Sequence, residues 1–400
     1  MDQKNRSAKI ITKVVLMLSL VSLFTDVASE MLYPVMPIYL ESIGFSIVLI
    51  GILEGLAEAV AGLSKGYFGK MSDNLGFRLP FVRWGYFLSA LSKPMMAIFT
   101  FPAWIFSART IDRLGKGIRT GARDAMLSAE ASAQTRATVF GFHRSMDTLG
   151  AVMGPIIALV FLYFYPAHYK TLFLLAFFPG LTAILITFLL KEKPVATRIH
   201  KVRTSFFDFF RYWKTSPKFY RGLVIGLLLF TLFNSSDVFL LLRLKESGMD
   251  DTYTIGIYVF YNLVYAIAAY PLGILADKLG LKNIFIAGLA IFAMVYGGMS
   301  ISSGMIGFIL LFFLYGIYAA ATEGVSKAWI SNLVNKGDTA TAIGTYTGFQ
   351  SICSMLASSI AGLLWYQFGS RAMFLTTSLA VLLVIIYVAL LKSDKDINMA

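Results

Sequence analysis

The sequence predicts an all-α membrane protein with twelve transmembrane helices, arranged as two pseudo-symmetric six-helix bundles. Three observations lead to this fold class. The 400-residue chain is 57% hydrophobic and 14% charged, with a mean hydropathy of +0.71, which is too apolar for a soluble domain. Apolar stretches long enough to cross a bilayer recur along it, and one charged turn occurs twice at a constant spacing.

Twelve apolar stretches have the length of a spanning helix, because about 20 residues rising 1.5 Å each cross about 30 Å of hydrocarbon. In chain order they are residues 12–41, 45–69, 80–100, 102–123, 137–160, 170–190, 222–244, 253–275, 283–302, 305–331, 340–362 and 372–391. The sequence therefore predicts an N-terminal six-helix bundle over residues 1–190, a linker over 191–221 and a C-terminal six-helix bundle over 222–400.

Lysines and arginines gather in the N-terminal tail and in the linker, whereas the alternate turns carry few. Both termini and the linker are therefore expected to be cytoplasmic. This topology accounts for most of the net charge of +13, and no zinc ligands or basic recognition helix indicate nucleic-acid binding. Four phenylalanines between residues 206 and 210, beside Arg211 and Trp213, predict a short amphipathic helix in the linker.

Several soluble chemistries are excluded by composition. Cys353 is the single cysteine, and His143, His168 and His200 are scattered, so neither a disulfide framework nor a Cys/His metal site is expected. No nucleophile–base arrangement or phosphate loop is present, so we expect neither an enzyme nor a bound cofactor. The first apolar run is too long for a cleavable signal peptide.

The repeated turn has the pattern G-x3-D-x2-G-x-[RK]. Its two copies, 204 residues apart, are Gly69, Asp73, Gly76 and Arg78, and then Gly273, Asp277, Gly280 and Lys282. Each aspartate is expected to accept backbone N–H bonds at the start of the next helix. Two sets of six spans with this turn resemble the major facilitator superfamily over essentially the whole chain. The resemblance implies a secondary transporter with its substrate site between the halves, in which Asp73 and Asp277 help to hold the outward-facing state.

Span five contains the second motif of this resemblance. Gly141-x8-Gly150-x3-Gly154-Pro155 is similar to the antiporter motif of proton-coupled drug exporters in the superfamily. Glycines at such positions let another helix approach closely, and Pro155 can bend the span. A plain packing role would also explain these residues, but the resemblance favours export.

Charged residues are unusually frequent within the spans of the first half. Each costs at least about 2.5 kcal/mol in hydrocarbon, so they are expected to be paired, water-facing or functional. The acids are Asp26, Glu30, Glu54, Glu58, Asp112 and Asp147, and the bases are Lys93, Arg109, Arg113, Lys116 and Arg144. The near balance predicts a buried ion-pair network, which either fixes helix register only or contains carboxylates that load and release protons.

Spans one and four line the central cavity in the superfamily, and this implies roles for their charges. Asp26, Glu30 and Asp112 are the candidates for proton coupling, whereas Glu54, Glu58 and Asp147, on interface spans, are expected to be structural. The candidates for the substrate cavity are Arg109, Arg113, Lys116, Arg144, Asn234, Asp237, Tyr258, Tyr261 and Tyr265. The three tyrosines share one face of span eight, and packing is their alternative role.

The sequence thus predicts a proton-coupled secondary transporter of a bacterial-type inner membrane, acting as a monomer in lipid and exporting a small amphipathic molecule by alternating access. The alternative within transport is a proton symporter that imports an anionic metabolite or chelate, which would be bound by Arg109, Arg113, Lys116 and Arg144. An alternative of another class is a non-transporting membrane receptor or a lipid-handling protein.

Overall fold

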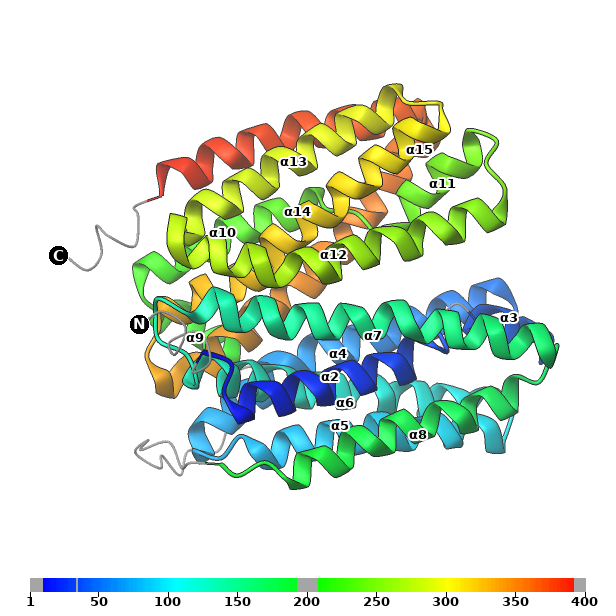
Figure 1. The fold of residues 1–400 in the computed structure, drawn as a ribbon, viewed down its shortest axis with the longest axis horizontal. Helices are drawn as coiled ribbons and strands as arrows, with labels where there is room; N and C mark the ends of the chain where they lie inside the picture. The colour runs from blue at the N-terminus through cyan, green and yellow to red at the C-terminus, as the bar shows by residue number, and fades with distance from the viewer. Residues whose placement is uncertain (1–9, 34, 193–207, 392–400) are drawn as a thin grey trace, which may run out of the picture. The chain divides into compact units, whose positions relative to one another are not determined.

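The computed structural model describes residues 10–33, 35–192 and 208–391, and all regular structure within them is helical (Figure 1). The helices are α2 (Lys13–Glu30), α3 (Met36–Ser42), α4 (Ile47–Leu75), α5 (Leu79–Ile98), α6 (Pro102–Ala129), α7 (Arg136–Phe164), α8 (Tyr169–Phe188), α9 (Asp208–Thr215), α10 (Lys218–Phe233), α11 (Val238–Glu246), α12 (Asp251–Leu279), α13 (Leu281–Ile301), α14 (Met305–Asn332), the 3-10 turn η1 (Lys336–Asp338) and α15 (Thr339–Leu390). Short turns join most of them, which favours neighbouring antiparallel helices.

The chain forms two compact units. Unit 1 comprises Met1–Ala131, Met146–Thr215 and Asn335–Gly348, and unit 2 comprises Ser132–Ser145, Ser216–Val334 and Phe349–Ala400. The first turns of α7 therefore pack in unit 2, and the first turns of α15 pack in unit 1. Each unit is thus completed by a short segment from the other part of the sequence.

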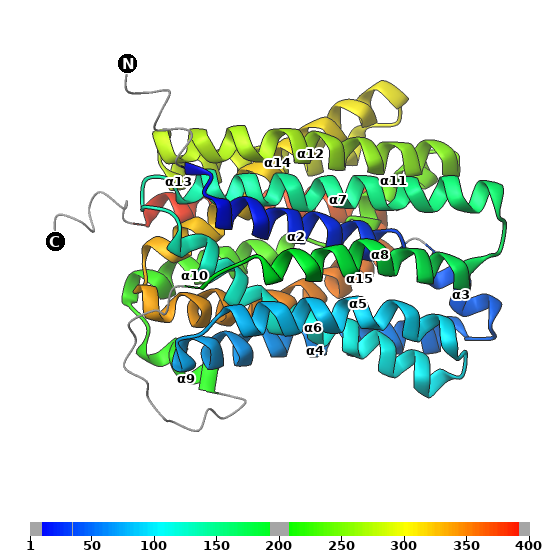
Figure 2. The same ribbon diagram turned by 60° about the horizontal axis from the view of Figure 1, so that its bottom comes forward.

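Unit 1 is a bundle of long helices. Helix α5 packs between α6 and α8, α4 packs on α6, and α2 packs on α8. Figures 1 and 2 show that the axes of these helices are nearly aligned, with α2 beside α7 and α8. Their apolar faces meet in a core that includes Leu23, Met96, Ile105 and Phe173. Thr12 begins α2 by accepting a hydrogen bond from the Val15 N–H, as an N-cap residue does.

Unit 2 is built around α14, which packs on both α12 and α13. Its core is aromatic: the rings of Phe292 and Tyr296 stack with centroids 4.1 Å apart, and Phe292 meets Tyr318 edge-on at 4.8 Å. Large rings fill the space between helices with few rotatable bonds. This rigid core holds the helices that carry the polar residues of unit 2.

Seven helical segments within the described residues are long and apolar enough to cross a membrane: residues 136–164, 169–188, 218–246, 256–279, 281–301, 305–332 and 336–390. The last of these contains the predicted spans eleven and twelve, which meet at Gly369, where φ is +81°. Helices α2, α4, α5 and α6 occupy the predicted spans one to four. The total of twelve spans and the cytoplasmic termini stay predictions.

The predicted span seven is a broken helix in the structure. Helix α10 ends at Phe233 and α11 begins at Val238, so residues 234–237 interrupt the helix within an apolar segment. Irregular backbone inside a membrane is tolerated only where protein or a water-filled cavity surrounds it. The interruption therefore marks a site of interest in unit 2.

The linker contains α9, at Asp208–Thr215, while Phe206 and Phe207 lie outside the described residues. Tyr212 of α9 is buried, and the Lys70 ammonium of α4 lies 5.9 Å from the centroid of its ring. Burial raises the pKa of the Tyr212 hydroxyl above its ordinary value, and the charge of Asp338 adds to this effect. The helix is thus fastened to the end of α4.

Candidate functional site

Both aspartates of the repeated turn cap a helix that is remote in sequence. In unit 1, Oδ2 of Asp73 accepts hydrogen bonds from the backbone N–H and the hydroxyl of Thr341, at 2.7 and 2.9 Å. In unit 2, the Asp277 carboxylate accepts from the N–H groups of Ala137 and Thr138, at 3.0 and 2.7 Å. An anion is favourable at a helix N-terminus, where N–H groups lack partners.

The prediction that each aspartate caps the next helix in the chain is therefore wrong. Asp73 caps α15 instead of α5, and Asp277 caps α7 instead of α13. Helix α5 is capped by Glu192, whose carboxylate accepts from the N–H groups of Arg78 and Leu79. Sequence distance conceals this arrangement, because the partners lie more than 130 residues apart.

Glycines make room for the two capped helices. A Cβ added at Gly69 would lie 2.4 Å from the carbonyl oxygen of Ala340, and one added at Gly273 would lie 2.4 Å from that of Ala137. Gly76 and Gly280 adopt φ of +69° and +99°, which only glycine tolerates easily. Gly141 faces α12 in the same way, with an added Cβ 2.5 Å from the Ala269 carbonyl oxygen.

The two capping aspartates differ in their cations. Asp73 forms an ion pair with Arg78 at 3.2 Å, and the same guanidinium donates to the carbonyl oxygens of Ala125 and Lys336. Lys282 holds the equivalent position in the second copy, and its ammonium donates to the carbonyl oxygens of Ala389 and Leu391 instead. The two copies thus share their caps but not their ion pairs.

Replacing Asp73 with alanine is expected to destabilise the protein more than replacing Asp277 with alanine. Loss of either cap costs about 0.5–2 kcal/mol, but Asp73→Ala also leaves the buried Arg78 without its carboxylate. The midpoint of thermal unfolding, measured on the purified protein in detergent, checks this order. Equal shifts for the two variants would contradict it. Asp250→Ala, which removes a cap at an exposed helix start, is the control for the loss of a cap alone.

Span four carries Arg109, Asp112, Arg113 and Lys116 at helical spacing, so they form a charged stripe along one side of α6. At Asp112 the stripe forms an ion pair with span three. Nζ of Lys93 on α5 lies 2.7 Å from Oδ1 of Asp112 on α6, and Nη1 of Arg109 lies 3.6 Å from Oδ2. Lys93 and Asp112 are only 1% and 6% exposed. Gly85 and Gly115 let the helices cross closely, since a Cβ added at Gly115 would lie 2.5 Å from the Gly85 carbonyl oxygen.

The proton-coupling candidate Asp112 is therefore held between two cations. Removing the charge of this carboxylate would leave two buried cations uncompensated. This arrangement suits a fixed structural charge. Asp26 and Glu30, on α2, have different surroundings.

A cluster of acidic residues forms where α2 meets α7. The Ser22 hydroxyl donates to Asp147, and the carboxylate of Asp147 lies next to that of Asp26. Two glycines of the antiporter-like motif create this contact: a Cβ added at Gly150 would lie 2.4 Å from the Leu23 carbonyl oxygen and 3.0 Å from Cβ of Asp26. Gly154 lies against the end of α2 one turn further along, where an added Cβ would lie 2.6 Å from the Met31 backbone nitrogen.

Asp147 is thus a polar residue whose place sequence reasoning missed. The sequence predicts a structural role for it, yet the structure brings it to Asp26, the candidate for proton coupling. Its spacing of three residues from Gly150 was the available signal, because residues one turn apart on a helix face the same neighbour. Arg123 also joins this cluster, donating to Ser22 at 3.2 Å and to Asp124 at 2.9 Å.

Glu30 lies within electrostatic reach of several basic residues of α6. The charges of Lys116 and Arg113 act on its carboxylate, and that of Arg109 acts more weakly. Lys116 is exposed within the described structure, whereas Arg113 is half-buried. The side chains of Glu54 and Glu58 lie outside the described part of the structure. The basic residues of α6 thus act on two carboxylates, Asp112 and Glu30.

Arg144 lies in unit 2 with different partners. Its Nε donates to the Tyr265 hydroxyl at 2.6 Å, its guanidinium lies 5.7 Å from the centroid of that ring, and it pairs with Glu323. Pro155 lies within α7 without ending the helix. Among the cavity candidates, Arg144 and Tyr265 therefore form a pair apart from the residues at the helix break.

The helix break presents Asp237 to two helices of unit 2, α12 and α14. Its two carboxylate oxygens accept hydrogen bonds from the hydroxyls of Tyr261 and Tyr315, at 2.6 and 2.7 Å. Asn234 donates to the Tyr318 hydroxyl at 3.0 Å. Tyr258 lies against Tyr261, with ring centroids 5.5 Å apart. We refer to Asp237, Tyr258, Tyr261 and Tyr315 as the tyrosine cage.

Sequence reasoning missed Tyr315 and Tyr318, which α14 contributes.

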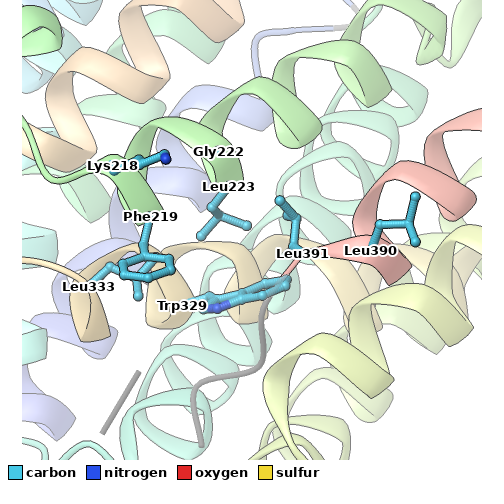
Figure 3. Close-up of a pocket in the computed structure, with 8 residues that line it drawn as sticks. All are labelled: Lys218, Phe219, Gly222, Leu223, Trp329, Leu333, Leu390 and Leu391. Atoms are coloured by element: carbon cyan, nitrogen blue, oxygen red, sulfur yellow. The ribbon is translucent and has the colours of Figure 1, made fainter. Parts of the chain in front are cut away.

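A cavity of about 340 Å³ lies elsewhere in unit 2 (Figure 3), lined by Lys218, Phe219, Gly222, Leu223, Trp329, Leu333, Leu390 and Leu391. None of the predicted site residues lines it. Within the described residues, no group of His, Cys, Asp or Glu side chains could hold a metal ion.

Comparison with solved structures shows the fold. The human organic anion transporter MFSD10 matches with a TM-score of 0.76 at 16% identity, over 94% of this chain and 98% of that one. The transporter FucP in its outward conformation matches with a TM-score of 0.75 at 13% identity, over 96% and 100%. A further structure of FucP, the fucose:proton symporter of E. coli, matches with a TM-score of 0.75 at 12% identity, over 95% and 98%.

Sequence relatives agree with this fold. The MFS-type transporter MJ1317 of Methanocaldococcus jannaschii is 32% identical over 374 residues, which cover 91% of this chain and 92% of that protein. The protein Rv2265 of Mycobacterium tuberculosis is 30% identical over 137 residues, 34% of this chain and 33% of its own length. The family model of the Major Facilitator Superfamily matches residues 18–261 and 244–398. The chain is therefore a multi-pass membrane transporter, not an enzyme, and belongs to the major facilitator superfamily.

Proposed function

We propose that this transporter exchanges protons for a small amphipathic molecule and exports that molecule across the plasma membrane, the inner membrane of a bacterial-type cell. Its termini and linker face the cytoplasm in this proposal, and one chain works alone. The observation that carries the proposal is the contact between Asp26 and Asp147. The two carboxylates form the proton site, with Glu30 beside it.

The chemistry of a carboxylate pair supports this role. A hydrogen bond between two carboxyl groups needs a proton on one of them, because two ionised carboxylates repel and offer only acceptors. Such a pair takes up and loses its proton as a unit. A site that holds one proton in one conformation and releases it in another is what proton coupling needs.

The position of the pair connects the proton to helix movement. Asp26 lies on α2 and Asp147 on α7, and the contact depends on the close crossing at Gly150. A shift of one helix against the other separates the carboxylates and favours loss of the shared proton. The caps at Asp73 and Asp277 are further contacts that an alternating-access cycle is expected to form and break.

One similarity supports both proton coupling and outward transport, and a second supports proton coupling alone. The glycine motif of α7 resembles that of proton-coupled exporters, and one structural neighbour, FucP, is a fucose:proton symporter. Another neighbour, MFSD10, is an organic anion transporter, which is why import of an anion is the competing direction. Asp112 forms an ion pair with Arg109 in the described structure. One of the cations that would bind an imported anion therefore already has a carboxylate partner.

The test measures dye accumulation in bacterial cells that lack their own efflux pumps. Cells expressing the wild type are expected to accumulate less of the cationic dye ethidium than cells with empty vector, and a protonophore should abolish the difference. Asp26→Asn should accumulate dye like the empty vector, and Asp147→Asn should lose most of the efflux, because neither variant can share a proton between two carboxylates.

Asp250→Asn serves as the control, since its carboxylate caps an exposed helix start, and it should behave like the wild type. The anionic dye carboxyfluorescein is measured in parallel. Proton-dependent uptake of carboxyfluorescein would favour the symporter that imports anions. Full efflux by Asp26→Asn, at wild-type expression, would remove Asp26 from the coupling path.

A further inference from the structure

The interruption of span seven places polar residues inside an apolar part of unit 2. Residues 234–237 are non-helical between α10 and α11, inside a segment apolar enough to span the membrane. Broken helices at membrane depth expose backbone groups and the ends of helix dipoles, and transporters use such breaks to bind substrates or ions. The question is which chemistry this break would bind.

Asp237 gives the site a negative charge. It is half-buried, and its described partners are the hydroxyls of Tyr261 and Tyr315, at 2.6 and 2.7 Å. None of the ion pairs found in the described part of the chain includes Asp237. Two neutral donors orient the carboxylate but do not cancel its charge. A cation is the group that would do so.

The rings around Asp237 also favour a cation. Tyr258 and Tyr261 have centroids 5.5 Å apart, and Tyr261 and Tyr315 have centroids 5.3 Å apart. The faces of aromatic rings attract a cation within about 6 Å, most strongly where water is excluded. A half-buried carboxylate beside several such rings favours an organic cation over an anion, because the carboxylate attracts the first and repels the second.

Asn234 provides a second, independent indication. Its Nδ2 donates to the Tyr318 hydroxyl, whereas its Oδ1 is buried and accepts no hydrogen bond from the described residues. A buried acceptor without a donor costs free energy, and an ammonium N–H is a donor that would satisfy it. Asn234 lies three residues before Asp237, at the other end of the same break.

We propose that the tyrosine cage, with Asn234, binds the ammonium group of an amphipathic substrate. The Asp237 carboxylate supplies the charge, the rings of Tyr258, Tyr261 and Tyr315 surround the cation, and Oδ1 of Asn234 accepts an N–H. This proposal rests on the proposed transport of a small amphipathic molecule and adds the class of that molecule. It does not depend on which residues carry protons.

Equilibrium binding to the full-length protein in lipid nanodiscs tests the site without any gradient. The probes are 4-phenylbutylammonium, 4-phenylbutanol and 4-phenylbutyrate, which share one ring and chain but carry positive, neutral and negative groups. Empty nanodiscs correct for partition into lipid. The wild type is expected to bind the ammonium at least about tenfold more tightly than the alcohol, as one charge-assisted contact predicts, and the carboxylate least.

Asp237→Asn keeps the shape of the side chain and removes its charge, so it should abolish the preference for ammonium over alcohol. Asp237→Glu should retain much of it, and Asp250→Asn should leave it unchanged. Equal wild-type affinity for the three probes would overturn the proposal, and this measurement needs no variant to fold. Retained preference in a monodisperse Asp237→Asn protein would overturn it as well.

The two proposals can fail separately. Ammonium selectivity without proton-driven efflux would leave the tyrosine cage standing and remove the proposed exporter. Proton-driven efflux of ethidium by a protein that shows no preference among the three probes would do the opposite.

Discussion

Replacing Lys93 with alanine is expected to destabilise the protein by about 3–5 kcal/mol. Its ammonium lies 2.7 Å from the Asp112 carboxylate, and both side chains are almost fully buried. Removing Lys93 leaves the buried Asp112 carboxylate with only the longer ion pair to Arg109, at 3.6 Å. The midpoint of thermal unfolding of the purified protein should therefore fall by many degrees, far more than for Lys170→Ala, whose side chain is exposed.

The double variant Lys93→Met with Asp112→Leu distinguishes the loss of the whole ion pair from the loss of one of its charges. Apolar residues of similar volume often replace a buried ion pair at little cost. The double variant leaves only Arg109 without the carboxylate, so it should be more stable than Asp112→Leu, which leaves both Lys93 and Arg109 without it. If Lys93→Ala unfolded like the wild type, the ion pair would have no structural role. If the double variant were stable but inactive, the charges of Lys93 and Asp112 would serve transport.

Replacing Gly150 with alanine is expected to abolish proton-driven efflux while leaving a folded protein. The added Cβ would lie 2.4 Å from the Leu23 carbonyl oxygen and 3.0 Å from Cβ of Asp26. Backbone atoms cannot rotate away as a flexible side chain can, so α7 must move from α2. Overpacking of this kind costs about 1–3 kcal/mol, and the movement separates Asp147 from Asp26.

Gly256→Ala is the matched control, because an added Cβ at Gly256 meets nothing within 4 Å. This variant should transport and unfold like the wild type, or be slightly more stable, since alanine favours helix. Ethidium efflux and the midpoint of thermal unfolding are measured for both variants. Wild-type efflux by Gly150→Ala would mean that close contact of Asp26 and Asp147 is not needed for transport.

Most of the architecture follows from local properties of the sequence. Apolar stretches of spanning length have to form helices in a bilayer, because every backbone polar group must find its partner within the segment. The repeated turn likewise follows from local chemistry, since Gly76 and Gly280 adopt positive φ. The family resemblance rested on these same features, and the matches over the chain confirm it.

The candidate site was less predictable, because its contacts join residues remote in the chain. The sequence alone determined that Asp26, Asp112 and Asp237 lie in apolar stretches, where a charged side chain is costly unless it is paired, hydrated or functional. Only the tertiary structure decided what surrounds each one: two cations for Asp112, a second carboxylate for Asp26 and two tyrosine hydroxyls for Asp237. The physical reason is that hydropathy acts along the chain over a few turns, whereas the partner of a buried charge depends on which helices cross, and glycines such as Gly150 set those crossings.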